Sequence, residues 1–409
     1  MNSAHVKAWV RGGSIVLLLV CWAGCPFFIC GCKEASKVSF VPRRTEIPGY
    51  RTVVPFELAN NMPLVEVSVD GRGPYHFVLD TGSSTLMLSR ELAARINAPS
   101  IPVEAILATP AGKVSLGYVR HVKSVEVGAA GFRDVSAGVL DLAGIRKSVS
   151  AEVQGVLGLN IFANCRLTID YPARQLVLET SAKAEPLSPD EDNVVPLRPL
   201  SDDLVAVPIV VNKNTYWCML DSGHGSGIVV PNEMAAALPL MAPPVRVPTS
   251  TMTFRGKLPN RKARLKGSAT LGPHELVRPI TLFQAGAPKI GGEVLKHFIV
   301  TIDQQAMVAR FVQAVEGPIA TPPSIRHHGF FYERESEGWI ITGPIEGVTL
   351  DQLSLEVDDR VMMVDNTPTS ELSDEQLKAL VANSNTLTLS ILRGKARVSA
   401  SIPVTVLVP

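Results

Sequence analysis

The segments YHFVLDTGSSTLMLS (75–89) and YWCMLDSGHGSGIVV (216–230) repeat one pattern. In each, an apolar run typical of a buried strand leads into an Asp-Thr/Ser-Gly tripeptide, and a second apolar run follows. Asp80 and Asp221 occupy matching positions, 141 residues apart. A single tripeptide of this kind usually marks a turn, because Asp and Ser bond to nearby backbone and Gly tolerates positive φ. Two copies with matching flanks instead predict a duplicated unit with two carboxylate-bearing loops.

The match extends upstream of both motifs. Residues 51–80 and 204–221 alternate apolar and polar side chains, as half-buried strands do. Turn-forming residues interrupt these runs at Asn60-Asn61, Asp70-Gly71 and Asn212 to Thr215. We therefore predict that hairpins lead into each motif.

The match also extends downstream. Short helices are predicted over 89–96 and 231–238. GVLGLNIFANCRLTIDYPARQLVLE then matches PKIGGEVLKHFIVTIDQQAMVARFV, with Gly158 aligned with Gly291. Asp170 and Asp303 end the two TID segments, where we expect them to close turns. The whole unit is therefore duplicated.

Composition bounds the class of protein. The 409 residues are enough for two or three domains. The 39 basic and 38 acidic residues give a net charge of +1, which argues against a nucleic-acid partner. Short runs of Val, Thr, Ile, Leu and Gly, broken by turn residues, predict a mainly β fold with few and short helices.

Residues 1–32 read as a targeting segment. Two basic residues precede a long apolar run, which has the length of a signal peptide or of a single membrane anchor. Its ending, ICGC, resembles a bacterial lipobox with Cys32 as the lipidated residue, and Cys25 is the competing site. A cleaved and lipidated signal peptide and an uncleaved membrane anchor both predict an exported, membrane-anchored protein of the cell envelope. Cys165 and Cys218 remain for the mature domains; both fall at apolar positions of the repeat, so we expect buried thiols without a disulfide.

Two carboxylates on symmetric loops suit peptide hydrolysis by an activated water. Like charges a few ångströms apart cannot both ionise comfortably, so the pair shares one proton. The ionised member takes a proton from water, and the protonated member stabilises the oxyanion that develops on the scissile carbonyl. Thr81 and Ser222 are predicted to bond across to the opposite loop, and Gly82 and Gly223 to let backbone N–H groups approach the carboxylates.

The paired motifs and paired apolar-Gly segments resemble the aspartic proteases, over about residues 50 to 312. The short lobes are similar to the retropepsin-like branch, duplicated in one chain as in bacterial aspartyl proteases. The resemblance implies Asp80 and Asp221 as the catalytic dyad, and braces at Gly158 and Gly291. It also implies two pseudo-symmetric β-barrel lobes, and flap hairpins for which 105–118 and 251–260 are the candidates. No metal or organic cofactor is implied.

Two residues depart from the pattern of the family. His224 stands where Ala or Ser is usual, and Lys289 stands where an apolar residue is expected. An imidazole beside the dyad would shift its pKa or block the loop, unless the side chain points to solvent. These residues keep open the alternative of a protease-like fold that binds peptides without cleaving them.

The C-terminal residues form a separate small domain. Short predicted strands surround one helix, SDEQLKALVAN, with Ser373 as its N-cap. HGFFYE and LEVDDRVMMVDNTP resemble a PDZ domain, although Asp358 replaces a usual Gly. The resemblance implies that Gly329, Phe330 and Phe331 hold the carboxylate of a C-terminal peptide. A packing module without a ligand is the alternative, and His327 and His328 are expected to be loop residues.

The sequence thus predicts a leader and three folded domains. Their ranges are 1–32 for the leader, 50–182 and 194–313 for the protease lobes, and 325–409 for the PDZ-like α+β domain. Linkers are expected at 182–192 and 316–324. Because one chain carries both motifs, the expected enzyme is a monomer that acts on a peptide or protein substrate.

Overall fold

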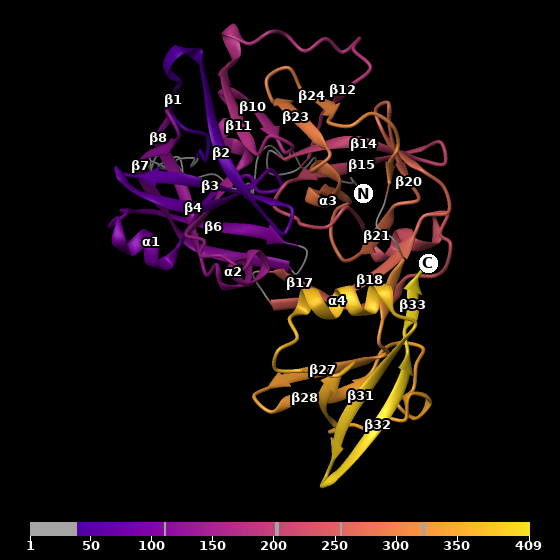
Figure 1. Ribbon diagram of the computed structural model, residues 1–409. Helices are drawn as coiled ribbons and strands as arrows, with labels where there is room; N and C mark the ends of the chain where they lie inside the picture. The colour runs from indigo at the N-terminus through magenta and orange to yellow at the C-terminus, as the bar shows by residue number, and fades with distance from the viewer. Residues whose placement is uncertain (1–38, 110–111, 201–203, 254–255, 321–323) are drawn as a thin grey trace, which may run out of the picture. The chain divides into compact units, whose positions relative to one another are not determined.

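The computed structural model describes residues 39–109, 112–200, 204–253, 256–320 and 324–409 (Figure 1). The predicted leader and the lipidation site at Cys32 lie outside this range. The chain divides into two compact units. The first runs to Pro208 and includes Trp217–Gly225 and Lys289–Ala314, whereas the second contains Ile209–Tyr216, Ser226–Pro288 and Val315–Pro409. Both Asp-Thr/Ser-Gly motifs therefore belong to the first unit.

A 14-stranded sheet system forms most of the first unit. Its strands are β1 (Arg44–Glu46), β2 (Arg51–Ala59), β3 (Met62–Val69), β4 (Arg72–Asp80), β5 (Leu86–Ser89), β6 (Ser100–Thr109), β7 (Gly112–Val127), β8 (Ala130–Leu140), β9 (Gly155–Gly158), β10 (Cys165–Asp170), β11 (Gln175–Thr180), β12 (Val194–Pro196), β23 (Phe298–Asp303) and β24 (Val308–Gln313). The short helices are α1 (Arg90–Arg95) and α2 (Ala143–Val149). Ser89 caps α1, its side chain accepting a hydrogen bond from the Leu92 N–H.

The predicted turns are present. Asn60 and Asn61, between β2 and β3, have φ of 49° and 62°, and Asp70 and Gly71 have φ of 49° and 72°. Positive φ at both central residues matches the right-handed twist of the flanking strands. The hairpin β2–β3 and the strand β4 therefore lead into Asp80 as the sequence predicts.

A second sheet system has 11 strands, and it includes most strands of the second repeat. Its strands are β13 (Arg198–Pro199), β14 (Val205–Val211), β15 (Asn214–Asp221), β16 (Ile228–Val230), β17 (Val245–Thr253), β18 (Gly256–Arg264), β19 (Ala269–Leu271), β20 (His274–Val277), β21 (Ile280–Phe283), β22 (Lys289–Gly291) and β25 (Ile319–Ala320), with helix α3 (Gly292–Leu295) after β22. The segment predicted as a helix over 231–238 is one 3₁₀ helix, Asn232–Ala236. Part of the predicted linker at 316–324 is β25, which pairs with β20.

The C-terminal part of the second unit has its own core. Its strands are β26 (Ile325–His327), β27 (Phe330–Glu335), β28 (Gly338–Pro344), β29 (Arg360–Val364), β30 (Thr367–Pro368), β31 (Thr386–Arg393), β32 (Ala396–Pro403) and β33 (Thr405–Val408), and its helix is α4 (Asp374–Asn383). Trp339, Ile341, Val361 and Ile391 are among the side chains that fill the core. Ser373 caps α4 in a capping box with Gln376, as the sequence predicts (Figure 1).

Candidate active site

Each motif aspartate ends a strand that pairs in parallel with its brace. Asp80 ends β4 and stands in register with Gly158 of β9, and Asp221 ends β15 in register with Gly291 of β22. A Cβ at Gly158 would lie 2.5 Å from the backbone of Thr85. Because real Cβ atoms do not approach backbone so closely, this position requires glycine.

Reciprocal hydrogen bonds join the two loops. The Thr81 Oγ1 donates to the Leu220 carbonyl (2.7 Å) and accepts from the Ser222 N–H (2.9 Å). The Ser222 Oγ donates to the Leu79 carbonyl (2.8 Å) and accepts from the Thr81 N–H (3.0 Å). Thr81 and Ser222 are 0% exposed, so these four bonds are shielded from water. They hold the two motifs in one symmetric arrangement.

The motif glycines bring each loop against the opposite aspartate. A Cβ on Gly82 would lie 2.5 Å from the Asp221 Cγ, and one on Gly223 would lie 2.3 Å from the Asp80 Cγ. The Gly82 N–H donates to the Asp80 Oδ1 at 2.9 Å. Only glycine leaves room for both carboxyl groups between the loops.

Asp80 and Asp221 ionise differently. Burial, followed by the negative charge of Asp221 and a hydrogen bond to it, raises the pKa of Asp80 to about 8. Burial also acts to raise the pKa of Asp221, but the positive charges of Lys289 and His224 and hydrogen bonds from Lys289 and Asp80 bring it below its ordinary value. The pair therefore carries one proton from acid pH to about pH 8, held on Asp80.

Lys289 makes the asymmetric contact at the dyad. Its Nζ lies 2.8 Å from the Asp221 Oδ2, and the two side chains are only 12% and 7% exposed. Lys289 stands in register with Met219, and alternate residues of a strand share a face, so Lys289 lies on the face of Asp221. The matching residue of the first repeat is Val156. Sequence reasoning noted Lys289 as a departure from an apolar pattern and missed the ion pair.

His224 contacts the backbone of α3, and Gly225 contacts the β2–β3 hairpin. His224 is half-buried, and its carbonyl accepts a hydrogen bond from the Gly292 N–H at 2.7 Å. The Asn61 Nδ2 donates to the Gly225 carbonyl at 2.9 Å, and a Cβ on Gly225 would lie 2.3 Å from the Asn60 carbonyl oxygen. The β2–β3 turn thus supports the second loop.

A pseudo-twofold axis passes between the repeats at the paired TID segments. β10 and β23 are antiparallel, with Thr168 opposite its own repeat partner Thr301, and their hydroxyls are 3.0 Å apart. Arg166 donates twice to the Asp303 Oδ2 in a buried ion pair. Asp170 accepts from the Ala173 N–H and Asp303 from two N–H groups of its turn, which confirms both as turn residues.

The candidate flaps form hairpins, and both mature cysteines are buried. β6 pairs with β7 and β17 with β18, while residues 110–111 and 254–255 at the tips lie outside the described residues. Cys165 and Cys218 are 2% and 1% exposed and are free thiols, as predicted. Burial raises the pKa of each to about 12, which keeps them unreactive.

The C-terminal loop differs from the expectation for its histidines. His327 ends β26 and is therefore a strand residue, whereas His328 lies in the loop between β26 and β27 as expected, and both side chains are buried. Their rings are 3.9 Å apart, and His328 packs against Phe330. Gly329 has φ of 95°, and its N–H donates to the His327 Nδ1 at 3.0 Å instead of pointing at a ligand. Phe330 belongs to the core of the domain, and Phe331 is half-buried beside Arg246.

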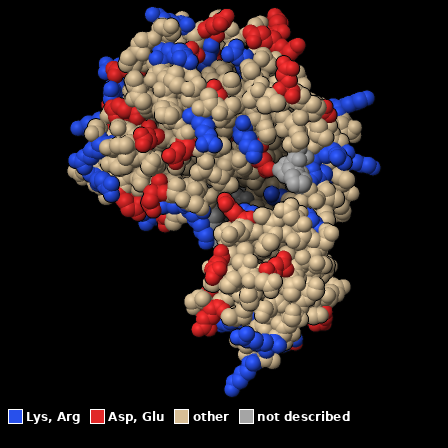
Figure 2. Space-filling view, in the orientation of Figure 1, with Lys and Arg blue, Asp and Glu red and all other residues tan. Residues whose placement is uncertain are grey.

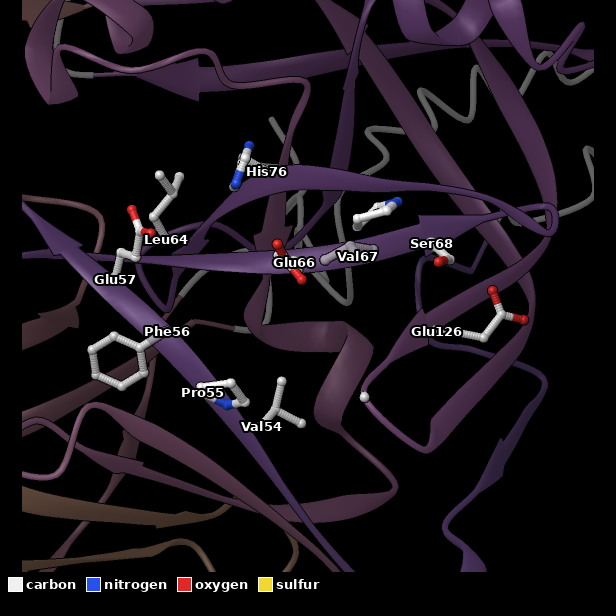
Figure 3. Close-up of a pocket in the computed structure, with 12 residues that line it drawn as sticks. Val54, Pro55, Phe56, Glu57, Leu64, Glu66, Val67, Ser68, His76 and Glu126 are labelled. Carbon is white, nitrogen blue, oxygen red and sulfur yellow. The ribbon is translucent and has the colours of Figure 1, made fainter.

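A pocket of about 450 Å³ lies elsewhere on the first unit (Figure 3). Val54, Phe56, Glu57, Glu66, His76 and Glu126 are among its lining residues. Glu66 and His76 face each other across β3 and β4, and neither motif aspartate lines the pocket. The motif loops, which carry the paired aspartates, remain the candidate active site.

Several other features of the described residues bear on function. No group of three His, Cys, Asp or Glu side chains within them is placed to bind a metal ion. No helix in the same part of the chain is long and apolar enough to cross a membrane. On the face shown in Figure 2, basic and acidic side chains are interspersed.

Comparison with known proteins matches the first of the two motif loops. Residues 65–161 match the family model of the aspartyl proteases, a segment that contains the first motif and its brace. Among solved structures, the crystal structure of basic 7S globulin from soybean matches with 12% sequence identity and a TM-score of 0.39, covering 64% of this chain and 94% of that chain. No curated protein matches the chain.

Proposed function

We propose that this protein is an aspartic endopeptidase that hydrolyses peptide bonds with a water activated between Asp80 and Asp221. The observation that carries the proposal is the hydrogen-bonded carboxyl pair of half-buried Asp80 and buried Asp221, held in place by the reciprocal bonds of Thr81 and Ser222. The match of residues 65–161 to the aspartyl protease family supports it.

The ionisation state of each aspartate determines its role in the reaction. Asp221, ionised, takes a proton from the attacking water as the O–C bond to the scissile carbonyl forms. Asp80, protonated, donates a hydrogen bond to the carbonyl oxygen and stabilises the developing oxyanion. When the C–N bond breaks, the leaving nitrogen takes a proton from the pair, which returns to its one-proton state. Because that state extends to about pH 8, activity should continue to neutral pH and fall above it.

The test is cleavage of an unfolded protein by the full chain from acid to alkaline pH. Asp80→Asn and Asp221→Asn should each reduce kcat/KM by about 10²- to 10⁴-fold, because each removes an acid–base group. If both variants cleave the substrate with the same kcat/KM as the wild type, the proposal is refuted.

The rest of the proposal concerns the other parts of the chain. The leader, 1–32, would carry the enzyme to the bacterial cell envelope, with Cys32 lipidated. The lobes at 50–182 and 194–313 would act as a monomer. The domain at 325–409 would recruit a C-terminal peptide or restrain the enzyme, and its sheet with helix α4 supports a PDZ-like role. Because the Gly329 N–H is taken by His327, a bound carboxylate would have to use other N–H groups.

A second function is favoured by one contact. The Lys289 ammonium occupies one oxygen of Asp221, which weakens that carboxylate as a base. A chain with this contact would use its protease-like fold to bind peptides without cleaving them. A folded wild type that binds a peptide substrate analogue but cleaves nothing at any pH would establish this alternative.

A further inference from the structure

The asymmetry of the dyad originates in β22. The two motif loops are related by the repeat, and so are their hydrogen bonds through Thr81 and Ser222. The brace strands differ at one position that faces the carboxyls, where Val156 of β9 corresponds to Lys289 of β22. Val156 is 1% exposed, so an apolar side chain fits at this register. A lysine there is not required by packing.

Lys289 contacts Asp221 directly, and His224 adds a second positive charge. Among the described residues, the titratable groups that act on Asp221 or respond to it include Asp80 from β4, Lys289 from β22, His224 after β15, and Tyr171 after β10. Tyr171 is buried, and the charge of Asp221 adds to burial in raising its pKa, so it stays neutral. At 2.8 Å and with little solvent nearby, the Lys289 ammonium favours the ionised carboxylate more strongly than an exposed lysine would.

We propose that Lys289 is a positioning residue that assigns the roles of the two aspartates. Its ammonium keeps Asp221 ionised, so Asp221 is the base and Asp80 holds the shared proton. This inference rests on the proposed function and adds to it the direction of the dyad and its working pH. Without Lys289, the two carboxyls would differ less, since His224 alone would still favour the ionised form of Asp221, and the one-proton state would begin at a higher pH.

The variants are chosen to separate charge from packing. Lys289→Met removes the ammonium at nearly constant length, and Lys289→Arg keeps a positive charge. Lys296→Met is the matched control, because the Lys296 Nζ lies 3.4 Å from the Asn61 Oδ1 and contacts neither aspartate in the described structure. All three are made in the full chain.

Two readouts are taken on each protein. The first is the carboxyl ¹³C NMR titration of the dyad, assigned with Asp80→Asn and Asp221→Asn, and the second is the acid limb of the pH profile of kcat/KM. An opposite charge typically lowers an Asp midpoint by about 1 to 3 pH units. Lys289→Met should therefore raise the Asp221 midpoint and the acid limb by about that amount, while Lys289→Arg and Lys296→Met stay close to the wild type.

The outcomes distinguish the two proposals. An unchanged Asp221 midpoint in Lys289→Met, or a wild type in which Asp80 is the group with the low midpoint, overturns the role of Lys289. A wild type that cleaves nothing but shows the lysine-dependent NMR shift refutes the endopeptidase while supporting the ionisation assignment. If Lys289→Met folds but loses activity, the Asp221 midpoint from the NMR titration tests the role of Lys289.

Discussion

Thr81→Val should strongly destabilise the first unit, because the Thr81 hydroxyl serves two backbone groups of the second motif. It donates to the Leu220 carbonyl and accepts from the Ser222 N–H, at 2.7 and 2.9 Å. Valine has nearly the same shape but leaves both groups buried without a partner. Each such loss costs about 1–3 kcal/mol, so the free energy of unfolding should fall by about 2–6 kcal/mol.

Thr281→Val is the matched control. Thr281 is also 0% exposed, but its hydroxyl has no hydrogen-bond partner among the described residues. Burying an unpartnered hydroxyl is unfavourable, so this change should be neutral or slightly stabilising. Both variants are compared by urea unfolding in an Asp80→Asn background, which prevents self-cleavage, with far-ultraviolet circular dichroism as the probe. If Thr81→Val costs no more than Thr281→Val, the loops are not held by these bonds.

Two further predictions concern the same site. Gly82→Ala and Gly223→Ala should each abolish cleavage while the protein stays folded, because a Cβ would lie within 2.5 Å of the opposite carboxyl. Gly267→Ala is the control and should keep wild-type kcat/KM, because nothing lies within 4 Å of the added Cβ. An active Gly82→Ala variant would contradict this geometry. The raised pKa of Asp80, from 3.8 to about 8, means that the folded state holds this proton more tightly, so its contribution to stability is complete below pH 3.8 and is lost as pH rises through about 8. Thermal unfolding from pH 4 to 8 should therefore show a fall in the free energy of unfolding of the wild type, on the order of 5 kcal/mol for the whole shift. The fall should be absent in Asp80→Asn. Parallel pH profiles of the two proteins would refute the prediction.

Features encoded within a few residues could be read from the sequence. The asparagine turn at Asn60-Asn61 and the Ser373 cap depend on local backbone chemistry, and both are present as predicted. The repeat itself aligns Asp80 with Asp221, and in the structure each stands in register with the glycine that the alignment pairs with it. Burial of the two cysteines followed from their apolar positions in the repeat.

Contacts between distant strands required the tertiary structure. Lys289 is 68 residues from Asp221 in the chain, and only the parallel pairing of β15 with β22 puts its ammonium on the carboxylate. The sequence likewise did not show that His327 pairs with β33, or that the ring of His328 packs against His327 in the loop that follows. The sequence by itself determined the duplication, the two aspartates and their supporting hydroxyls and glycines, because these are repeated local patterns. Only the tertiary structure decided which aspartate lies beside a cation, because the register between strands distant in the chain sets that distance.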